Sequence, residues 1–291
     1  MKKIVIIGAS GFIGSTMFNY LSQKLSNDCV VKGTYFSNKK ANELLYMDIT
    51  DSKQIEHYLL MEKPYFILML AGSKDVKKCE MDYSFAYKMN TQPVEFIVDT
   101  IKKYDLDTKL IFFSTDYVFD GEDGNYTTKD IPNPITNYGK TKLLAERVLF
   151  ESNIDFKIIR TGAVMGKNGI FFDWLIRTLN IENNVFVFEN VFFSPTPIQL
   201  LNEMVRALIL NYENSPEKLL HIVGDQRLNR YQFAMMISRL VETKCANLVP
   251  ENANLEQSLF HKDLSLNQSD FVRERQTKSL DEYLENEVYH D

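Results

Sequence analysis

The feature that most constrains the fold is a strand, a glycine-rich turn and a helix at the start of the chain. Ile4-Val-Ile-Ile7 is a continuous β-branched run, typical of a parallel strand buried on both faces. Gly8, Gly11 and Gly14 follow and open a helix that we expect to reach about Leu25. Glycines there allow a tight turn, close backbone approach to a pyrophosphate and close helix packing. The spacing is GxxGxxG rather than GxGxxG, so a plain strand-to-helix turn is the alternative.

The segments that follow predict a doubly wound α/β sheet. Further strands are expected at 29–35, 46–49 and 65–70, with helices over 52–62 and 82–104. Pro93 falls inside the last helix and should start a new turn or kink it. Strands that alternate with helices predict a mainly parallel, Rossmann-type sheet covered by helices.

The residues after the second predicted strand bear on the choice of cofactor. That strand, which ends at Tyr35, lacks the terminal acidic residue that would bind the adenosine ribose and select NAD. Small hydrogen-bonding and cationic residues that could hold a 2′-phosphate stand there instead: Ser37, Asn38, Lys39 and Lys40. We therefore favour NADPH; NADH stays possible, and the two lysines could equally form a solvated loop. Asp48 could reach the adenine, and Ala71 and Gly72 would let the cofactor lie against the fourth strand.

The middle of the chain pairs a strand end with a helix that bears two reactive groups. Leu110–Phe113 is a short apolar run that ends in Ser-Thr-Asp, as a parallel strand does when it delivers polar side chains to a site. The stretch 136–151 has helical periodicity, and Tyr138 and Lys142 share one of its faces. An adjacent cation favours the ionised phenol and should lower its pKa from ~10. Tyr138 is therefore a candidate general acid.

Composition excludes several classes of function. The net charge of −6 offers no basic surface for nucleic acid. Cys29, Cys79 and Cys245 are widely spaced and the histidines lie far apart, so we expect reduced thiols and no metal site. No apolar run approaches the roughly 20 residues of a spanning helix, and the chain starts directly with a strand rather than a signal peptide. We expect a cytoplasmic protein without a membrane partner.

Taken together, these motifs resemble the extended short-chain dehydrogenase/reductases. The glycine trio, the strand that ends in Thr115 and Tyr138-x-x-x-Lys142 carry the resemblance. The run Ser114-Thr-Asp-Tyr-Val-Phe-Asp-Gly121 is more narrowly similar to the dTDP-4-dehydrorhamnose reductase branch, which the methionine adenosyltransferase regulatory β subunit shares. Arg160-Thr-Gly, Ser194-Pro-Thr and Asp263-Leu-Ser-Leu match in order as well, so the similarity spans nearly the whole chain.

The resemblance implies a role for individual residues. Thr115 would bind the substrate carbonyl oxygen, Tyr138 would protonate it, and Lys142 would bind the nicotinamide ribose, with Asn90 supporting Lys142 through water or making an ordinary hydrogen bond. The implied cofactor site comprises Gly8, Ser10, Gly11, Phe12, Ile13, Gly14, Ser37, Asp48, Ile49, Ala71, Gly72, Asn90, Tyr138 and Lys142. The implied substrate site comprises Val76, Asp116, Tyr117, Ala163, Trp174 and Thr196. For Trp174, core packing is the alternative to stacking on a nucleobase.

The resemblance also implies two domains and a reaction class. Residues 1–160 would bind NADP(H), and 161–291 would mainly bind substrate, with an interlaced boundary. In the second part we expect a strand at 157–160 extending to 165, helices at 171–181, 196–212 and 231–242, strands at 185–188 and 219–223, and a solvated terminal helix at 281–291. Sugar-nucleotide dehydratases have an acidic pair after the threonine; here Tyr117 replaces one carboxylate, so reduction is favoured over elimination.

The expected function is reduction of a 4-keto group on a nucleotide-linked 6-deoxy sugar, for polysaccharide biosynthesis, by a homodimer packed through helices 82–104 and 136–151. Departures from the branch pattern at Lys74, Ala163 and Phe193 fall where the sugar would bind, so another nucleotide sugar or a non-sugar ligand stays open. Two further alternatives remain. One is a non-catalytic NADP(H)-binding regulatory subunit, and the other is an epimerase or a reductase of another ketone.

Overall fold

The computed structural model describes residues 1–39, 41–241, 247–256 and 258–289. Lys40, Cys245 and the last two residues of the acidic tail therefore lie outside the described residues. The described chain divides into two compact units, each taken by itself below. The first comprises Met1–Val118, Pro132–Arg160 and Pro216–Leu219, and the second comprises Phe119–Ile131, Thr161–Ser215 and Leu220–Asp291.

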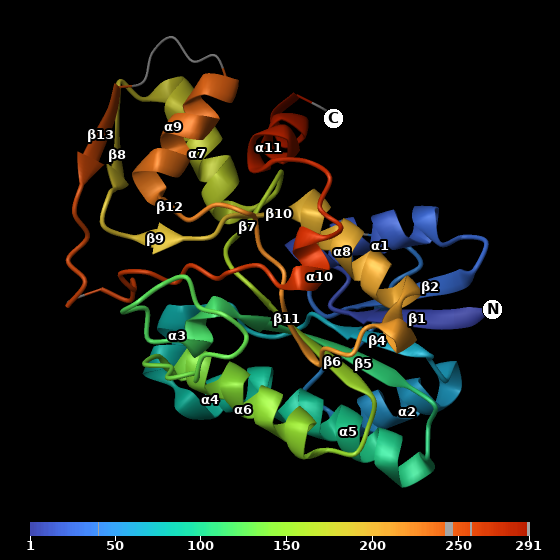
Figure 1. Ribbon diagram of the computed structural model, residues 1–291. Coiled ribbons are helices and arrows are strands. Elements are labelled where there is room, and N and C mark those ends of the chain that lie inside the picture. The colour runs from blue at the N-terminus through green and yellow to red at the C-terminus, as the bar shows by residue number, and fades with distance from the viewer. Residues whose placement is uncertain (40, 242–246, 257, 290–291) are drawn as a thin grey trace. The chain divides into compact units, whose positions relative to one another are not determined.

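A seven-stranded sheet, most of which belongs to the first unit, has the strand order β11-β6-β5-β4-β1-β2-β3 (Figure 1). Its strands are β1 (Lys2–Ile7), β2 (Cys29–Tyr35), β3 (Leu45–Tyr46), β4 (Phe66–Met69), β5 (Lys109–Thr115), β6 (Phe156–Thr161) and β11 (Leu219–His221). Neighbours from β3 to β5 pair in parallel. The predicted doubly wound α/β class is confirmed.

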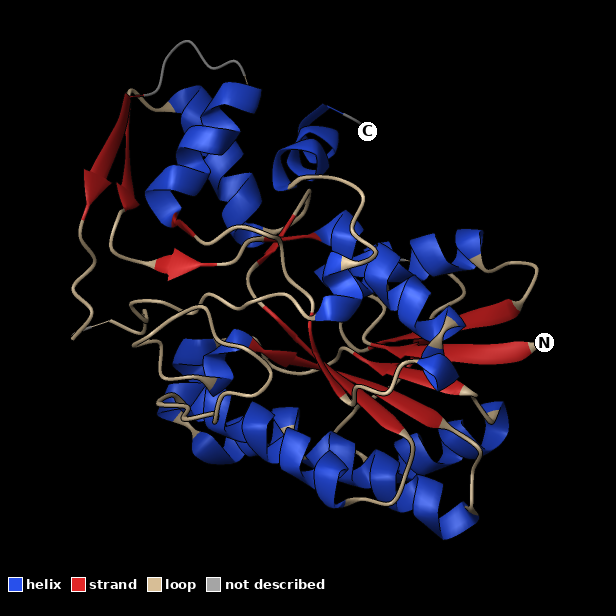
Figure 2. Ribbon diagram, viewed as in Figure 1, coloured by secondary structure: helices blue, strands red, loops and turns tan. Residues whose placement is uncertain are grey.

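Helices cover this sheet, most of them where the apolar periodicity predicts them. They are α1 (Phe12–Lys24), α2 (Ser52–Glu62), α3 (Val76–Met81), α4 (Tyr83–Asn90), α5 (Gln92–Tyr104) and α6 (Asn137–Glu151), and at least one of them follows each of β1, β3, β4 and β5 along the chain (Figure 2). The sequence did not predict α3. The predicted interruption at Pro93 is confirmed, because the helix breaks at Thr91 and Pro93 lies in the first turn of α5. The predicted third strand is shorter than expected, so Asp48 lies beyond β3.

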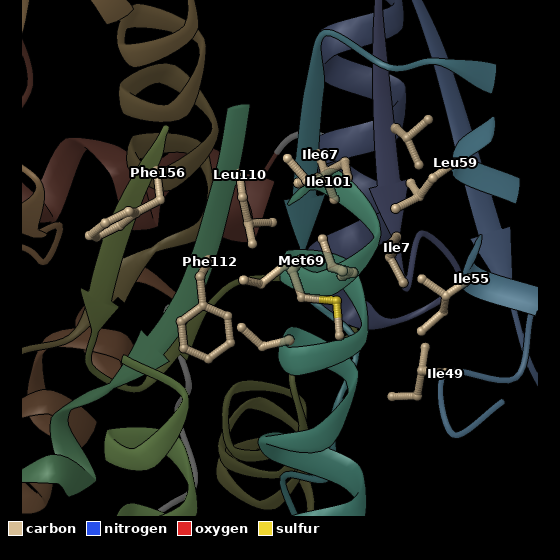
Figure 3. Packing of buried hydrophobic residues seen from close by; sticks show 14 of the residues in the cluster. Ile7, Ile49, Ile55, Leu59, Ile67, Met69, Ile101, Leu110, Phe112 and Phe156 are labelled. Carbon is tan, nitrogen blue, oxygen red and sulfur yellow. The ribbon is translucent and has the colours of Figure 1, made fainter. Parts of the chain in front are cut away.

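The core of the first unit forms where one face of the sheet meets α2, α5 and α6. Alternate strand residues such as Ile67, Met69, Leu110 and Phe112 point to this face, as the two-residue period of a strand requires (Figure 3). Helix residues that include Ile55, Leu59, Ile101 and Leu149 pack against them. This burial fixes the end of β5 against α6, the two elements that carry Thr115 and Tyr138.

The second unit contains α7 (Ile170–Ile181), α8 (Ile198–Leu210), α9 (Arg230–Leu240), α10 (Asp270–Arg273) and α11 (Leu280–Tyr289). Short strand pairs accompany them: β8 (Asn184–Phe188) with β13 (Asn247–Glu251), β9 (Phe192–Phe193) with β12 (Leu228–Asn229), and β7 (Val164–Met165) with β10 (Thr196–Pro197). Within the described ranges, no helix of either unit is long and apolar enough to cross a membrane.

Three predictions for the second unit were wrong. The strand expected to run from 157 to 165 is broken, because Val164 and Met165 pair with β10 in a different sheet. The helix expected from Thr196 begins at Ile198, since the Thr196 amide donates to the Ala163 carbonyl and Pro197 is the N-cap. The terminal helix α11 is not simply solvated: Leu280 and Leu284 belong to the core cluster with α7 and α9.

Candidate active site

The end of β5 and the start of α6 bring the predicted catalytic residues together. Thr136 is the N-cap of α6, and its hydroxyl accepts a hydrogen bond from the Gly139 amide. A side chain at Gly139 would collide with the Tyr117 carbonyl, so glycine lets α6 pack directly on the turn after β5. The Tyr138 ring then lies 5.5 Å from the Tyr117 ring, edge to face, and its phenol interacts with Thr115.

Thr115 is the second donor that this arrangement offers. Its Oγ1 donates to Asp116 Oδ1 at 2.9 Å and accepts a hydrogen bond from the Tyr117 amide at 3.3 Å. Thr115 and Asp116 are both buried. The Thr115 hydroxyl has one proton, which Asp116 accepts in this structure, so it would have to turn from Asp116 to donate to a bound carbonyl oxygen beside the phenol.

The pKa of Tyr138 is shifted in the direction opposite to the prediction. Burial raises the pKa of the phenol above its usual value, the hydrogen bond to Thr115 opposes this, and the Asp116 carboxylate adds to the rise. The residue as a whole keeps some exposed surface, but its hydroxyl lies among protein atoms. The predicted lowering by Lys142 is therefore wrong for this structure. A phenol of this kind holds its proton at neutral pH and can donate it.

The contacts of Lys142 explain why the pKa of Tyr138 is not lowered, because the Lys142 ammonium is bound to groups other than the phenol. Nζ donates to the Phe113 carbonyl at 2.5 Å and lies 4.0 Å from the centre of the Phe112 ring. Burial lowers the pKa of Lys142 to about 7, while the nearby Glu146 carboxylate acts to raise it. Glu146 was missed in the sequence analysis, although its place four residues after Lys142 on the same helix face is a signal that could have found it.

The glycine turn fits the pyrophosphate of a dinucleotide. Gly8 has φ +95°, and a side chain there would lie 2.8 Å from the Ala71 amide nitrogen. Gly11 is the N-cap of α1 and supplies no capping side chain, so the first-turn amides are not used by a cap at this position. Ser10, Phe12 and Ile13 are half-buried around the turn. The backbone can thus approach an anion at the start of a helix.

The remaining predicted cofactor residues fall into three environments. Ser37 and Lys39 are exposed after β2, with the Lys39 ammonium 5.8 Å from the centre of the Tyr35 ring. Asp48 uses Oδ1 to accept hydrogen bonds from the amide and hydroxyl of Thr50. Ile49 is 8% exposed and packs in the core of the first unit.

Asn90 joins the loop after β4 to α6. Its Oδ1 accepts a hydrogen bond from the Ser73 amide at 2.9 Å, and its Nδ2 donates to Thr141 Oγ1 at 3.4 Å. A side chain at Gly72 would lie 2.8 Å from Asn90 Oδ1, so the loop passes close to this amide. A water-mediated link from Asn90 to Lys142 stays a prediction.

The predicted substrate residues lie in both units. Val76, at the start of α3, and Tyr117 are half-buried in the first unit. In the second unit, the Thr196 amide donates to the Ala163 carbonyl, which brings these two residues together. Trp174 stacks on Phe171 and lines a cavity of about 650 Å³ with Arg177 and residues of α7 and β8. Their contact with a substrate stays a prediction.

The family model for the RmlD substrate binding domain matches residues 1–258. The chain belongs to this family. The predicted resemblance to the dTDP-4-dehydrorhamnose reductase branch is thereby confirmed.

Relatives of this RmlD-family chain include reductases and a methionine adenosyltransferase subunit. A dTDP-4-dehydrorhamnose reductase of Aggregatibacter actinomycetemcomitans is 26% identical over 89% of this chain and 85% of that protein. The methionine adenosyltransferase 2 subunit beta of Bos taurus is 23% identical over 86% of this chain and 75% of that protein. A dTDP-4-dehydrorhamnose reductase of Bacillus anthracis, solved in complex with NADP, has a TM-score of 0.84 at 26% identity and covers 99% of this chain and 98% of its own.

Proposed function

We propose that this protein is a cytoplasmic reductase that uses NADPH to reduce the 4-keto group of a nucleotide-linked 6-deoxy sugar for polysaccharide biosynthesis. The observation that carries the proposal is the interaction of Tyr138 with Thr115 at the end of β5. Lys142 of the same helix bonds the Phe113 carbonyl of that strand, and the glycine turn after β1 leaves room for a dinucleotide. The reductase of Aggregatibacter actinomycetemcomitans and the NADP complex of the Bacillus anthracis reductase support the substrate class and the cofactor.

Each residue would have a distinct task. NADPH supplies the hydride for the carbonyl carbon when it is bound. Tyr138, whose raised pKa keeps the phenol protonated, donates its proton to the carbonyl oxygen, and Thr115 donates a second hydrogen bond. Lys142 would bind the nicotinamide ribose through its ammonium. The first-turn amides of α1 would bind the pyrophosphate.

The test is consumption of reduced nicotinamide with dTDP-4-dehydro-L-rhamnose, followed by absorbance. We expect turnover with NADPH and slower or equal turnover with NADH, since the residues after β2 offer no carboxylate to the ribose. A panel of other nucleotide-linked ketosugars should accompany it because Lys74, Ala163 and Phe193 depart from the branch pattern. If NADPH binds but none of these ketones is reduced, the proposal is wrong.

In that case a regulatory subunit becomes the leading alternative. The similarity to the beta subunit of the bovine methionine adenosyltransferase supports this second candidate. A binding subunit can retain Thr115, Tyr138 and Lys142 without turnover. Stable copurification with a methionine adenosyltransferase, together with absent ketone reduction, would favour it over the reductase.

We also propose that the protein is a homodimer packed through α4, α5 and α6. These helices expose the aromatic side chains of Tyr83, Tyr104 and Phe150, which are 48%, 39% and 51% exposed. Burying such groups between copies would remove apolar surface from water. Light scattering should give twice the chain mass of 33.9 kDa, and a monomeric mass at micromolar concentration would exclude this dimer.

A further inference from the structure

Aromatic side chains gather on the surface of the first unit where β2 and β3 end. Phe36 directly follows β2, and Tyr46 is the last residue of β3, the outermost strand of the sheet. The rings of Phe36 and Tyr46 stack with 5.9 Å between their centres and 29° between their planes, and Tyr35 meets Tyr46 edge to face at 5.9 Å. Phe36 and Tyr46 are called the aromatic pair below.

The aromatic pair is exposed to a degree that its contribution to the fold does not explain. Phe36 is 57% exposed and Tyr46 is 53% exposed. An aromatic ring stabilises a fold chiefly by leaving water, and more than half of each of these residues stays in contact with it. Single exposed apolar side chains are ordinary, whereas contiguous ones mark sites of interaction. The surroundings of the pair indicate which ligand it binds.

The aromatic pair lies beside the glycine turn that fits a pyrophosphate. Strand β2 pairs with β1 in parallel, so Phe36 and the turn after β1 leave the sheet at the same edge (Figure 1). The Gly8 amide donates to Thr34 Oγ1 at 3.2 Å, and a side chain at Gly33 would lie 2.5 Å from Ala9 Cβ, so the turn packs directly on β2. A dinucleotide whose pyrophosphate lies on the first turn extends its adenosine over the end of the second strand.

The polar groups around this position suit the ribose and phosphate better than the base. Asp48 accepts hydrogen bonds from the Thr50 amide at 2.9 Å and the Thr50 hydroxyl at 2.8 Å, both through Oδ1. Ser37 and Lys39 are exposed, and the Lys39 ammonium lies 5.8 Å from the centre of the Tyr35 ring. A hydroxyl and a cation match a phosphate oxygen. The flat apolar surface that matches a purine is the aromatic pair.

We propose that the aromatic pair binds the base of the dinucleotide, with the adenine stacked on the exposed face of the Phe36 ring. This inference rests on the proposed binding of NADP(H), and it does not depend on turnover. Tyr46 holds the Phe36 ring in place through their stacked contact, so the surface is formed before the ligand arrives. Stacking contacts the face of a base and not its hydrogen-bonding edge, so it tolerates a change of base. Selection between NADP and NAD is then left to the groups around the 2′-phosphate.

The test is isothermal titration calorimetry of the full chain with NADP⁺ and with adenosine 2′,5′-bisphosphate, which lacks the nicotinamide half. In Phe36→Ala the Kd of both nucleotides should rise ~5–150-fold, the usual effect of removing a ring from under a base. Phe36→Trp keeps a stacking ring and should restore binding. Tyr46→Ala should raise both Kd values by a smaller factor, because it removes the support of the Phe36 ring.

Leu45→Ala is the matched control for the two alanine variants. Leu45 is 46% exposed and precedes Tyr46 in β3, so its side chain points to the opposite face of the sheet. Its Kd values should stay within about twofold of native, and all these exposed substitutions should leave the urea midpoint close to native. An equal loss of affinity in Leu45→Ala would show that any apolar residue of this edge matters, and would overturn the proposal.

Two ligand comparisons distinguish stacking from recognition of the base edge. Nicotinamide hypoxanthine dinucleotide phosphate carries an oxo group in place of the 6-amino group, and the native chain should bind it within about threefold of NADP⁺. A loss of about tenfold or more would assign the base to a group that hydrogen-bonds its edge, and would overturn the proposal. Phe36→Ala should also weaken NAD⁺ and NADP⁺ by the same factor, because the groups around the 2′-phosphate are unchanged.

The remaining outcomes are equally decisive. Native affinity for both nucleotides in Phe36→Ala would overturn the proposal, and a lower mass of that variant by light scattering would then identify the aromatic pair as a contact between copies. Absence of nucleotide binding by the native chain would overturn it as well. Because calorimetry needs no ketone, weaker binding in Phe36→Ala without any ketone reduction by the native chain would reject the reductase and leave this inference intact.

Discussion

Replacing Tyr138 by phenylalanine is expected to lower kcat for ketone reduction by ~10²–10⁴-fold while NADPH still binds, since a positioned general acid contributes about this much. The ring keeps its edge-to-face contact with Tyr117, 5.5 Å between centres, so the substitution removes the proton donor without opening a cavity. Stopped-flow absorbance of NADPH gives the rate, and nucleotide fluorescence gives its Kd.

The size of this loss should not depend on pH between 6 and 8. Burial raises the pKa of Tyr138, so the native phenol is protonated across that range and both proteins keep a fixed ratio of rates. Tyr104→Phe removes a hydroxyl at the exposed end of α5, where the hydroxyl donates to Glu56 and not to a predicted site residue, and should stay within about twofold of the native rate. A Tyr138→Phe protein that retains the native rate would assign the acid to another group.

The secondary structure of the first unit was largely predictable because local sequence patterns determine where its strands and helices begin and end. Strand β2 and helix α2 begin and end at the expected residues, 29–35 and 52–62. Buried parallel strands are uninterrupted apolar runs, and the Asp51 cap fixes the start of α2 through hydrogen bonds to the amides of its first turn. The same logic placed Tyr138 and Lys142 on one face of α6.

The second unit was less predictable because short strands depend on partners far along the chain. Thr196 and Pro197 form a strand only because Val164 and Met165 lie beside them, a pairing that no local pattern encodes. The terminal helix is rich in acidic residues, so the sequence analysis did not recognise its apolar stripe of Leu280, Tyr283 and Leu284. Hydrophobic periodicity identifies the apolar face of a helix. It does not identify the element that packs on that face, which only the tertiary structure shows.

The contacts of the charged groups in the site were also not predictable from local sequence patterns. Tyr138 and Lys142 lie four residues apart in α6, yet the Lys142 ammonium bonds the Phe113 carbonyl. Helical spacing determines the position at which a side chain leaves the backbone. The position of the side chain's terminal group depends on the hydrogen-bond acceptors that other elements supply. The shifts in pKa of Tyr138 and Lys142 follow from burial, which only the packed structure defines.

Gly14→Ala should abolish NADPH binding and destabilise the first unit by at least ~1–3 kcal/mol, the typical cost of overpacking a close contact. An added Cβ would lie 2.1 Å from the Gly8 carbonyl oxygen and 2.9 Å from Ala9 Cα, so the backbone of the glycine turn must move. This steric cost outweighs the ~1 kcal/mol that alanine normally gains over glycine inside a helix. Urea unfolding measures the stability, and nucleotide fluorescence measures the binding.

Gly11→Ala is the control for Gly14→Ala. It separates the steric clash at Gly14 from the mere replacement of a glycine in this turn by alanine. Its φ of −71° suits any residue, and an added Cβ would meet the Gly8 carbonyl oxygen at 3.4 Å, an ordinary contact. We expect its free energy of unfolding to stay within about 1 kcal/mol of native. Weaker NADPH binding in Gly11→Ala at native stability would place the pyrophosphate against this turn, because the added methyl then obstructs only the ligand. Equal stability of Gly14→Ala and the native chain would instead show that the turn yields, and that its tight geometry is not what the binding site requires.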